Sequence, residues 1–501
     1  MLLCWKRLSI TLLLLAVLFP ALSGVALAGP DFAALLGPVD TPDFDVPSHA
    51  LAVDSQGFIY LAGSASSGMT VSRDAYDSTY NGGPSDIFIA KFDGLSSVLL
   101  TVTFLGGGGA EWVRAIMVDR DGTLVLTGST NSSDFTTVSN VPGAGRPLLK
   151  DQAVFVARID NALKHLEGVS LLGPGKGLAL AGSHDGSLYL VGQANSATFP
   201  SSGPGWDRSY NGGPADIFVA RLAGSLNILR ISFLGGMGWE LARGLTVEES
   251  GDVIVAGFTD SQDFPVSANP FAVNPADSNG NGFIARFDAD LENMSAAVLL
   301  GGSGHDVVNS LAPGKDGSFY VTGLTLSSDF PVTSGSFDES FNGEADIFVS
   351  RISANFEKLL ASTFLGGGGR DWAFSLISQD DSGVYIGGDT DSTTISGLLG
   401  SAREIRKEGE GDIVVFKMSP DLKTVDEAVF TDGAVNERTP VMTFGKEQRK
   451  VLAGLTNSPG FPAGANGAIV RKGKGYELFL MSLAPDPASA RNPAEPDEKK
   501  P

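Results

Sequence analysis

The chain has 501 residues, of which 43% are hydrophobic and 18% are charged, and this apolar content excludes an intrinsically disordered chain. Asp and Glu outnumber Lys and Arg by 57 to 35, giving a net charge of −22. Such an acidic chain argues against a nucleic-acid partner, because phosphates need a basic surface. Glycine accounts for 64 residues, well above its usual share of about 7%, which indicates many tight turns between short strands.

The first 28 residues have the organisation of a secretory signal peptide. A basic start and an apolar run from Leu8 to Leu22 precede Ala26-Leu27-Ala28, which matches a cleavage site. The alternative is an uncleaved membrane anchor, because Leu8–Ala28 is long enough to span a bilayer. Pro20 and the small residues after it favour cleavage, which also removes Cys4, the single cysteine. We therefore expect an exported chain with no disulfide, no membrane span after cleavage, and a core that stabilises it unaided.

Two sets of landmark residues recur through the rest of the chain with a period of about 65 residues. In the first set, a predicted strand ends in a glycine and is followed by a Ser/Thr-rich turn. These glycines are Gly63, Gly128, Gly192, Gly257, Gly323, Gly388 and Gly454. The second set consists of apolar segments centred on Phe88, Phe155, Phe218, Phe283, Phe348, Val414 and Phe479. Two independent sets that keep one period over seven copies identify an internal repeat.

Within one repeat the pattern is that of short strands. Ala115–Val118 and Thr123–Thr127 flank Asp121-Gly122, which indicates a tight hairpin. After a longer loop, two further strands are predicted at Val154–Ile159 and in a segment that ends at Leu172. No segment shows a sustained 3.6-residue period. Four antiparallel strands in each of seven repeats predict an all-β fold, a seven-bladed β-propeller in which each repeat is one blade.

Three segments carry a resemblance to a known family. They are Asp346-Ile347-Phe348-Val349, Phe364-Leu365-Gly366-Gly367 and the run from Thr325 to Pro331, and they resemble the bacterial seven-bladed β-propeller repeat family. The resemblance extends over nearly the whole chain after the signal peptide. It implies the propeller fold, but it implies little about activity, because the family is known as an architecture.

The last repeat lacks a fourth strand of its own. Its third strand is predicted at Glu477–Leu483, and a Pro-rich segment follows. Near the other end of the chain, Ala34-Leu35-Leu36-Gly37 matches Ser170-Leu171-Leu172-Gly173, so we expect the N-terminal strand to complete blade 7 and close the ring. The predicted organisation is a signal peptide over residues 1–28, a propeller over 29–484 and a disordered tail over 485–501.

An acidic residue recurs a few positions after the Leu-Gly-Gly turn that precedes each inner strand. These acids are Glu111, Glu240, Asp306, Asp371 and Glu437. One interpretation is a ring of carboxylates around the channel mouth that binds a cation or performs acid–base chemistry. The other is that each carboxylate accepts hydrogen bonds from N–H groups in its own turn and serves only its blade.

Tryptophans accompany these acids on the same predicted face. Trp112 and Trp372 directly follow a repeated acid, Trp239 directly precedes one, and Trp206 lies in a loop between second and third strands. Indoles beside carboxylates suit sugars, which offer an apolar ring face and hydroxyl groups. The alternative is that the indoles plug the channel mouth or wedge between blades. The predicted ligand-binding residues are Trp112, Trp239, Trp372, Glu111, Glu240 and Asp371.

The one candidate for a metal site is a calcium-like motif at Asp277, Asn279 and Asn281, with Asp288 at its twelfth position. The segment between Asn281 and Asp288 must form a blade strand, so a turn is the favoured interpretation and no metal or other cofactor is predicted. His305 beside Asp306 is a candidate general base, and a solvated loop histidine is the alternative.

These observations favour an exported, monomeric and non-enzymatic binding or scaffolding module. Its loop-rich face would bind a glycan or an envelope or extracellular protein, and no nucleic acid. The competing hypothesis is a propeller enzyme, a lyase or hydrolase, that acts on polysaccharide with Glu240, Asp306 and His305 as acid and base. Polar residues that break the repeat and cluster on one face would favour the enzyme, because catalysis needs asymmetric placement.

Overall fold

The computed structural model describes residues 32–37, 39, 49–96, 98–135, 152–267, 271–272, 279–378, 382–396, 398, 411–431, 435–458, 461 and 476–483. The signal segment over 1–28 and the tail over 485–501 lie outside these residues. The described chain is all-β, as predicted, with one 3-10 helix, η2 (Lys446–Gln448). Within it, no helix has the length and apolar character needed to cross a membrane.

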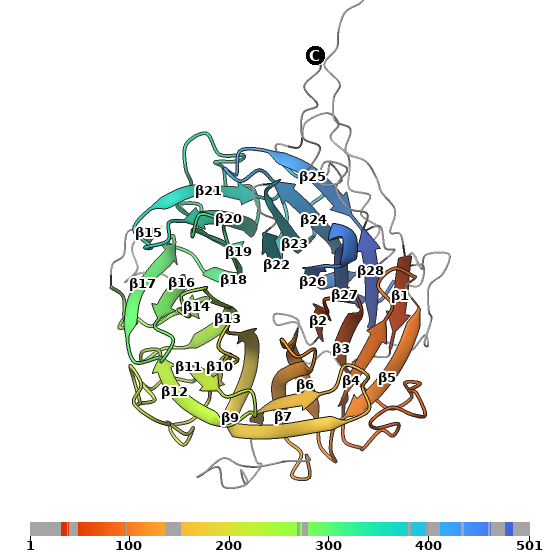
Figure 1. Cartoon of the computed structure of the whole chain (residues 1–501). Coiled ribbons are helices and arrows are strands. Elements are labelled where there is room, and N and C mark those ends of the chain that lie inside the picture. The colour runs from red at the N-terminus through yellow and green to blue at the C-terminus, as the bar shows by residue number, and fades with distance from the viewer. Residues whose placement is uncertain are drawn as a thin grey trace, which may run out of the picture.

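Figure 1 shows the strands grouped into sheets that stand around a central axis, with one strand of each group nearest the centre. These inner strands are β2 (His49–Val53), β6 (Glu111–Val118), the second half of β9 (Leu166–Gly182), β13 (Glu240–Val247), β18 (Asp306–Pro313), β22 (Asp371–Ser378) and β26 (Glu437–Phe444). Each pairs antiparallel with a second strand: β3 (Ile59–Ala65), β7 (Leu124–Thr130), β10 (Leu188–Ala194), β14 (Val253–Thr259), β19 (Phe319–Thr325), β23 (Val384–Thr390) and β27 (Lys450–Thr456).

Two further strands extend each unit outwards. The third strands are β4 (Asp86–Phe92), β8 (Ala153–Ile159), β11 (Asp216–Leu222), β16 (Asn281–Phe287), β20 (Asp346–Ile352), β24 (Asp412–Met418) and β28 (Glu477–Leu483). The outer strands are β5 (Leu99–Leu105), the first half of β9, β12 (Ile228–Leu234), β17 (Met294–Gly301), β21 (Leu359–Leu365), β25 (Val425–Phe430) and β1 (Phe32–Leu36). The antiparallel four-stranded unit predicted from the repeat is thus confirmed, and the arrangement is propeller-like.

Two features depart from a simple series of four-stranded sheets. β9 pairs with β8 through its first half and with β10 through its second half, so two units share one strand in a seven-stranded sheet. Only two residues separate Leu172 from Gly175, against five between Leu105 and Glu111, so the chain passes straight from one unit to the next. The short strand β15 (Phe271–Ala272) adds to the edge of another sheet by pairing parallel with β17.

The two sets of landmark residues are cross-strand partners. Gly128 of β7 pairs with Phe155 of β8, and the same glycine–phenylalanine pairing recurs between other second and third strands. A Cβ atom at Gly128 would lie 1.8 Å from the carbonyl oxygen of Trp112 and 3.0 Å from the Phe155 ring. Glycine is required there because the inner strand and the aromatic ring fill the space that a side chain would occupy.

Opposite these glycines, several inner strands carry a β-bulge. The register with the second strand shifts between Val113 and Ala115 in β6, and the equivalent shift occurs in β13, β18 and β22. The pairing register thereby skips one residue in each of these four inner strands. These residues are Arg114, Arg243, Asn309 and Phe374. A bulge redirects the side chain that it carries, and these four belong to the candidate site described below.

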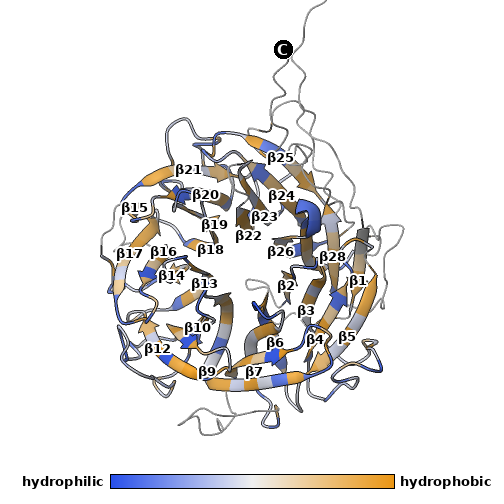
Figure 2. Cartoon of the chain, in the orientation of Figure 1, coloured by the Kyte–Doolittle hydropathy of each residue, from blue (hydrophilic) through white to orange (hydrophobic). Residues whose placement is uncertain are grey.

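The hydrophobic core lies between neighbouring sheets. One cluster combines Leu36 of β1 and residues of β27 and β28 with Phe88 and Phe92 of β4. β1 itself pairs antiparallel with β28, where Leu35 lies opposite Phe479. Leu35 and Leu36 are both buried. Figure 2 shows that hydrophobic residues dominate the strands and that most hydrophilic residues lie at strand ends and in loops.

The close approach at the landmark glycines gives a first prediction. A Cβ atom at Gly257 would lie 2.0 Å from the Leu241 carbonyl oxygen, whereas one at Gly368 would meet nothing within 4 Å. We expect Gly257→Ala to lower the free energy of unfolding by about 1–3 kcal/mol. Gly368→Ala, as the matched control, should change it by less than about 0.5 kcal/mol. Denaturant unfolding measures both, and equal effects would contradict the packing described.

Candidate functional site

The repeated acids are the first residues of their inner strands and are buried. All five are fully inaccessible to solvent. In β6, the Glu111 Oε1 atom accepts hydrogen bonds from the hydroxyls of Thr130, at 2.6 Å, and Ser132, and the Oε2 atom accepts the Gly107 N–H at 3.0 Å. The threonine and serine contacts recur at Glu240, Asp306, Asp371 and Glu437.

These contacts change the interpretation of the acids. Each carboxylate joins the start of an inner strand to its second strand, and those of Glu111, Glu240, Asp306 and Asp371 also accept an N–H of the preceding turn. The exposed carboxylate ring expected from the sequence is therefore not formed, because burial and hydrogen bonding hold Glu111, Glu240, Asp306 and Asp371 inside their units. The alternative interpretation, that each acid serves its own blade, describes the structure.

A second carboxyl group meets the repeated acid at three junctions between units. A Cβ atom at Gly106 would lie 2.6 Å from Asp86 Oδ1 and 2.9 Å from Glu111 Oε2, so the two carboxyls converge on this glycine. The same convergence joins Asp216 to Glu240 and Asp346 to Asp371. These three partner aspartates are also fully buried.

Burial raises the pKa of each partner aspartate, Asp86, Asp216 and Asp346, to about 7, and the neighbouring carboxylate adds to the shift. At the equivalent place in β16 the chain has Asn281, whose amide converges with Asp306 on Gly301. Asparagine has the shape of a protonated aspartic acid. The chain thus contains a permanently neutral version of the same junction.

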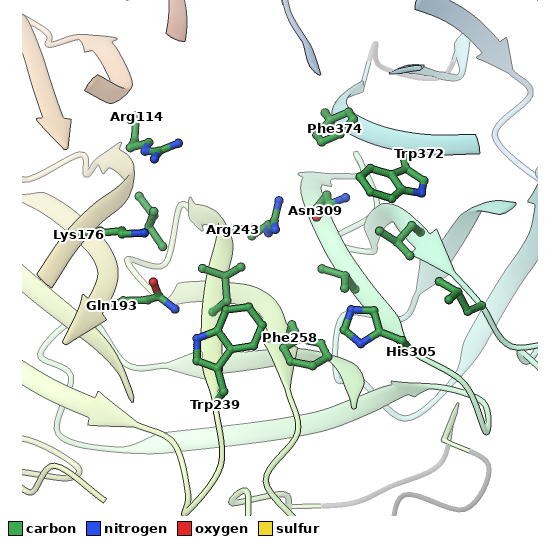
Figure 3. Close-up of a pocket in the computed structure, with 15 residues that line it drawn as sticks. Arg114, Lys176, Gln193, Trp239, Arg243, Phe258, His305, Asn309, Trp372 and Phe374 are labelled. Atoms are coloured by element: carbon green, nitrogen blue, oxygen red, sulfur yellow. The ribbon is translucent and has the colours of Figure 1, made fainter. Parts of the chain in front are cut away.

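Near the central axis a cavity of about 350 Å³ opens between inner strands β6, β9, β13, β18 and β22. Figure 3 shows its labelled side chains converging from these strands and their neighbours. The four bulged residues Arg114, Arg243, Asn309 and Phe374 all line it. The bulges therefore do more than accommodate the glycines, because the redirected side chains form part of the cavity wall.

Aromatic rings form one wall of the cavity. The ring centroids of Trp239 and Phe258 are 5.4 Å apart, and those of Phe258 and His305 are 4.6 Å apart. Trp372 and Phe374 form a second aromatic pair, with centroids 6.2 Å apart. The His305 Nδ1 atom lies 3.1 Å from the carbonyl oxygen of Asn279, which orients its ring. The predicted placement of Trp239, Trp372 and His305 at one mouth agrees with this arrangement.

The charged residues of the cavity are cationic. Arg114, Lys176 and Arg243 line it, and none of its described lining residues is Asp or Glu. Sequence reasoning missed these three residues, because it followed residues that recur between repeats. The signal that could have found them is variation rather than recurrence. Two positions after each acid the residue is small or β-branched, whereas the third position after the acid is Arg114, Arg243, Asn309 or Phe374 in four of the repeats.

Two buried polar atoms in the cavity wall are left without hydrogen-bond partners among the described residues. The Asn309 Nδ2 atom donates to the Ala373 carbonyl at 2.7 Å, which orients the amide, and its Oδ1 atom has no donor. The indole Nε1 of Trp372 has no acceptor. Buried polar groups in proteins are normally paired, so one acceptor and one donor are available here to a bound molecule.

Two of the tryptophans singled out from the sequence lie outside the cavity lining. Trp112 is half-buried in β6. Trp206 packs against Phe287 with ring centroids 6.0 Å apart, and its backbone N–H donates to the Leu291 carbonyl, so it serves contacts between units rather than the channel mouth.

The calcium-like motif does not converge in the part that the structure describes. Asp277 lies outside the described residues, Asn279 is exposed, and Asn281 is buried at the start of β16. Asp288 lies beyond the far end of β16, where it accepts the Glu292 N–H at 2.8 Å. Across the described residues, no group of three His, Cys, Asp or Glu side chains is placed to hold a metal ion.

No family model and no curated protein matches the chain, so the propeller-family resemblance depends on the repeat motifs alone. Among solved structures, a chain of a mitotic checkpoint complex is 10% identical, with 93% of this chain and 99% of that chain covered and a TM-score of 0.47. The polysaccharide lyase Uly1 is 11% identical, with 90% and 91% covered and a TM-score of 0.46. A protein of unknown function from Dyadobacter fermentans is 10% identical, with 91% and 100% covered and a TM-score of 0.41. Similarity at this level assigns neither an activity nor a ligand to this chain.

The carboxyl junctions predict a pH-dependent stability. Because the pKa of Asp216 is about 7 in the folded state and near 4 in an unfolded chain, the folded state binds more protons between these values. Stability should therefore fall as the pH rises from about 4 to about 7. We expect Asp216→Asn to raise the free energy of unfolding by about 1–3 kcal/mol at pH 8 and to change it little at pH 4.

Asn281→Asp is the matched reverse variant, and it should lose stability at pH 8 but much less at pH 4. Thermal unfolding across this pH range measures both variants. A pH-independent destabilisation by Asp216→Asn would contradict the proton-binding junction.

Proposed function

We propose that this protein is an exported, monomeric binding module that holds a saccharide in the cavity near the centre of its ring. The observation that carries the proposal is the contrast between two kinds of position in the inner strands. The acid recurs from unit to unit, whereas the bulged residues that meet in one cavity vary: two are arginine, one is asparagine and one is phenylalanine. Asymmetry of this kind is what a ligand site needs and what a structural repeat does not supply.

The chemistry of the cavity fits a sugar. Its volume of about 350 Å³ lies in the range of small-molecule sites, roughly 300–1,000 Å³. The indoles of Trp239 and Trp372 offer flat apolar surfaces for the face of a sugar ring. A sugar hydroxyl can both donate and accept, so hydroxyls can bond to Asn309 Oδ1 and to Trp372 Nε1. A protein ligand would have to insert a single side chain to make the same contacts.

Polar residues that break the repeat do cluster in the cavity, as both an enzyme and a binding site require, but Glu240 and Asp306, the acids of the enzyme hypothesis, do not line it. Cleavage of a polysaccharide by carboxylates needs an acid and a base beside the scissile bond. The carboxylates of Glu240 and Asp306 are buried within their units and engaged by threonine and serine hydroxyls. His305 does line the cavity, but no Asp or Glu accompanies it there among the described residues.

We also propose that the architecture is a seven-bladed propeller closed by the N-terminal strand. The pairing of β1 with β28 and the core cluster that joins β1 and β28 to β4 support this closure. Closure removes an exposed sheet edge, which an exported chain without disulfides would otherwise present to other molecules. A closed ring would also hold the inner strands at the spacing that the cavity requires.

The closure can be tested at Leu36, which is fully buried in β1. Leu36→Ala should lower the free energy of unfolding by about 2–5 kcal/mol and promote aggregation, because it leaves a cavity where the chain ends meet. Leu100 of the outer strand β5 is 44% exposed, so Leu100→Ala is the matched control and should change stability by less than about 1 kcal/mol. Calorimetry and light scattering measure these effects. A Leu36→Ala variant as stable and soluble as its control would oppose the closure.

Saccharide binding can be tested first on a glycan array and then by isothermal titration calorimetry with the oligosaccharides that bind. Replacing Trp239 or Trp372 with Ala should cost about 1–3 kcal/mol of binding free energy, roughly 5- to 150-fold in affinity. Trp206→Phe, outside the cavity, should leave the affinity unchanged. The proposal fails if no saccharide binds, or if binding is indifferent to both cavity tryptophans.

A further inference from the structure

The cavity is cationic inside a strongly acidic protein. The chain has a net charge of −22, yet Arg114, Lys176 and Arg243 line the cavity and none of its described lining residues is acidic. Cationic side chains that line one cavity attract a bound anion. A neutral ligand would gain nothing from this arrangement of charge.

Loop aspartates near β13 and β18 accept backbone N–H groups. Asp263 accepts the Met237 N–H at 2.9 Å, and Asp329 accepts the Ser303 N–H at 2.8 Å. Both contacts hold the turns that lead into inner strands. These two carboxylates therefore stabilise turns and are not among the residues that line the cavity.

The cations also lie beside the aromatic wall. Arg243 follows Trp239 by four residues across the start of β13, and Figure 3 shows its side chain between the Trp239–Phe258 wall and Asn309. Arg114 and Lys176 are on the neighbouring strands β6 and β9. A ligand that contacts both the indole and Arg243 must combine an apolar face with a negative charge. An arginine guanidinium binds a carboxylate or sulfate through two parallel hydrogen bonds, which also fixes the ligand's orientation.

We infer that the cavity selects an acidic saccharide, whose ring packs on Trp239 and whose carboxylate or sulfate group is bound by Arg243 together with Lys176 and Arg114. This inference rests on the proposed function and specifies its ligand class. An extended polyanion such as nucleic acid is disfavoured, because its phosphates would meet the acidic surface outside the cavity. A simple inorganic anion would leave the indoles and the two polar atoms of Asn309 and Trp372 without contacts.

The test compares matched pairs of oligosaccharides that differ only in charge. One pair is trigalacturonate and its neutral methyl ester, and the other is a sulfated chondroitin disaccharide and its desulfated form. By calorimetry at low salt, we expect the acidic member of at least one pair to bind tenfold or more tightly than its neutral partner. The difference should shrink at high salt, because part of the attraction is screened. The preferred pair distinguishes a uronate from a sulfate ligand.

Charge-removing variants identify the residues responsible. Arg243→Gln and Lys176→Gln should each reduce the affinity for the acidic member by about tenfold and leave the neutral member nearly unaffected. Using two variants protects the test if one fails to fold. Lys164→Gln removes the same charge from an exposed lysine in a surface ion pair with Asp74, and it should have no effect.

The results of these experiments distinguish the preference for an acidic ligand from saccharide binding itself. If neutral oligosaccharides bind as tightly as acidic ones, and binding depends on Trp239, the charge inference is wrong and the saccharide proposal stands. If the acidic preference survives both cavity substitutions, the assignment to Arg243 and Lys176 is wrong. If no oligosaccharide binds in a tryptophan-dependent manner, both are overturned.

Discussion

In five units, the contact between a glycine of the second strand and the backbone of the adjoining inner strand links the fold of this protein to its candidate site. At Gly128, Gly257 and Gly323 the inner-strand carbonyl lies where a Cβ atom would be, within about 2 Å. The inner strand can approach so closely only because glycine has no side chain, and at the same place it bulges by one residue. The bulge directs Arg114, Arg243 and Asn309 to the cavity. Packing that these units share thus presents arginine in two of them and asparagine in the third.

The residues of the inner strands therefore have two different roles. The buried acids and their threonine and serine partners hold each inner strand in place, and their identity is dictated by contacts inside the unit. The bulged residues have no such constraint, so their chemistry is free to differ. A residue that every unit repeats serves the unit, whereas a residue that one unit changes can serve a site.

Charge is distributed along the same division. Many acids of this acidic chain are occupied in structural contacts, either as buried carboxylates such as Glu240 or as loop aspartates such as Asp263 that accept backbone N–H groups. Some, such as Asp216, have a pKa of about 7 because burial disfavours their charge. The cations of the cavity differ from these acids. Because they lie on successive inner strands, they form a positively charged site in a protein whose net charge is negative.

The sequence by itself determined the all-β class, the repeat period and the positions of the strands. It could do so because local packing, which each repeat reproduces, requires the glycines, the phenylalanines and the Asp-Gly turns. It also indicated that Trp239, Trp372 and His305 share a face, since equivalent positions in successive repeats have equivalent places in the ring. Only the tertiary structure decided that Glu111, Glu240 and Asp371 are buried. Their threonine and serine partners lie 19 and 21 residues further along the chain in each case, but that spacing does not by itself show which side chains the strand pairing brings into contact. The cationic cavity also depends on the tertiary structure, because Arg114, Lys176 and Arg243 are far apart in the chain. A one-residue bulge directs Arg114 and Arg243 into the cavity, and the repeat period does not reveal that bulge.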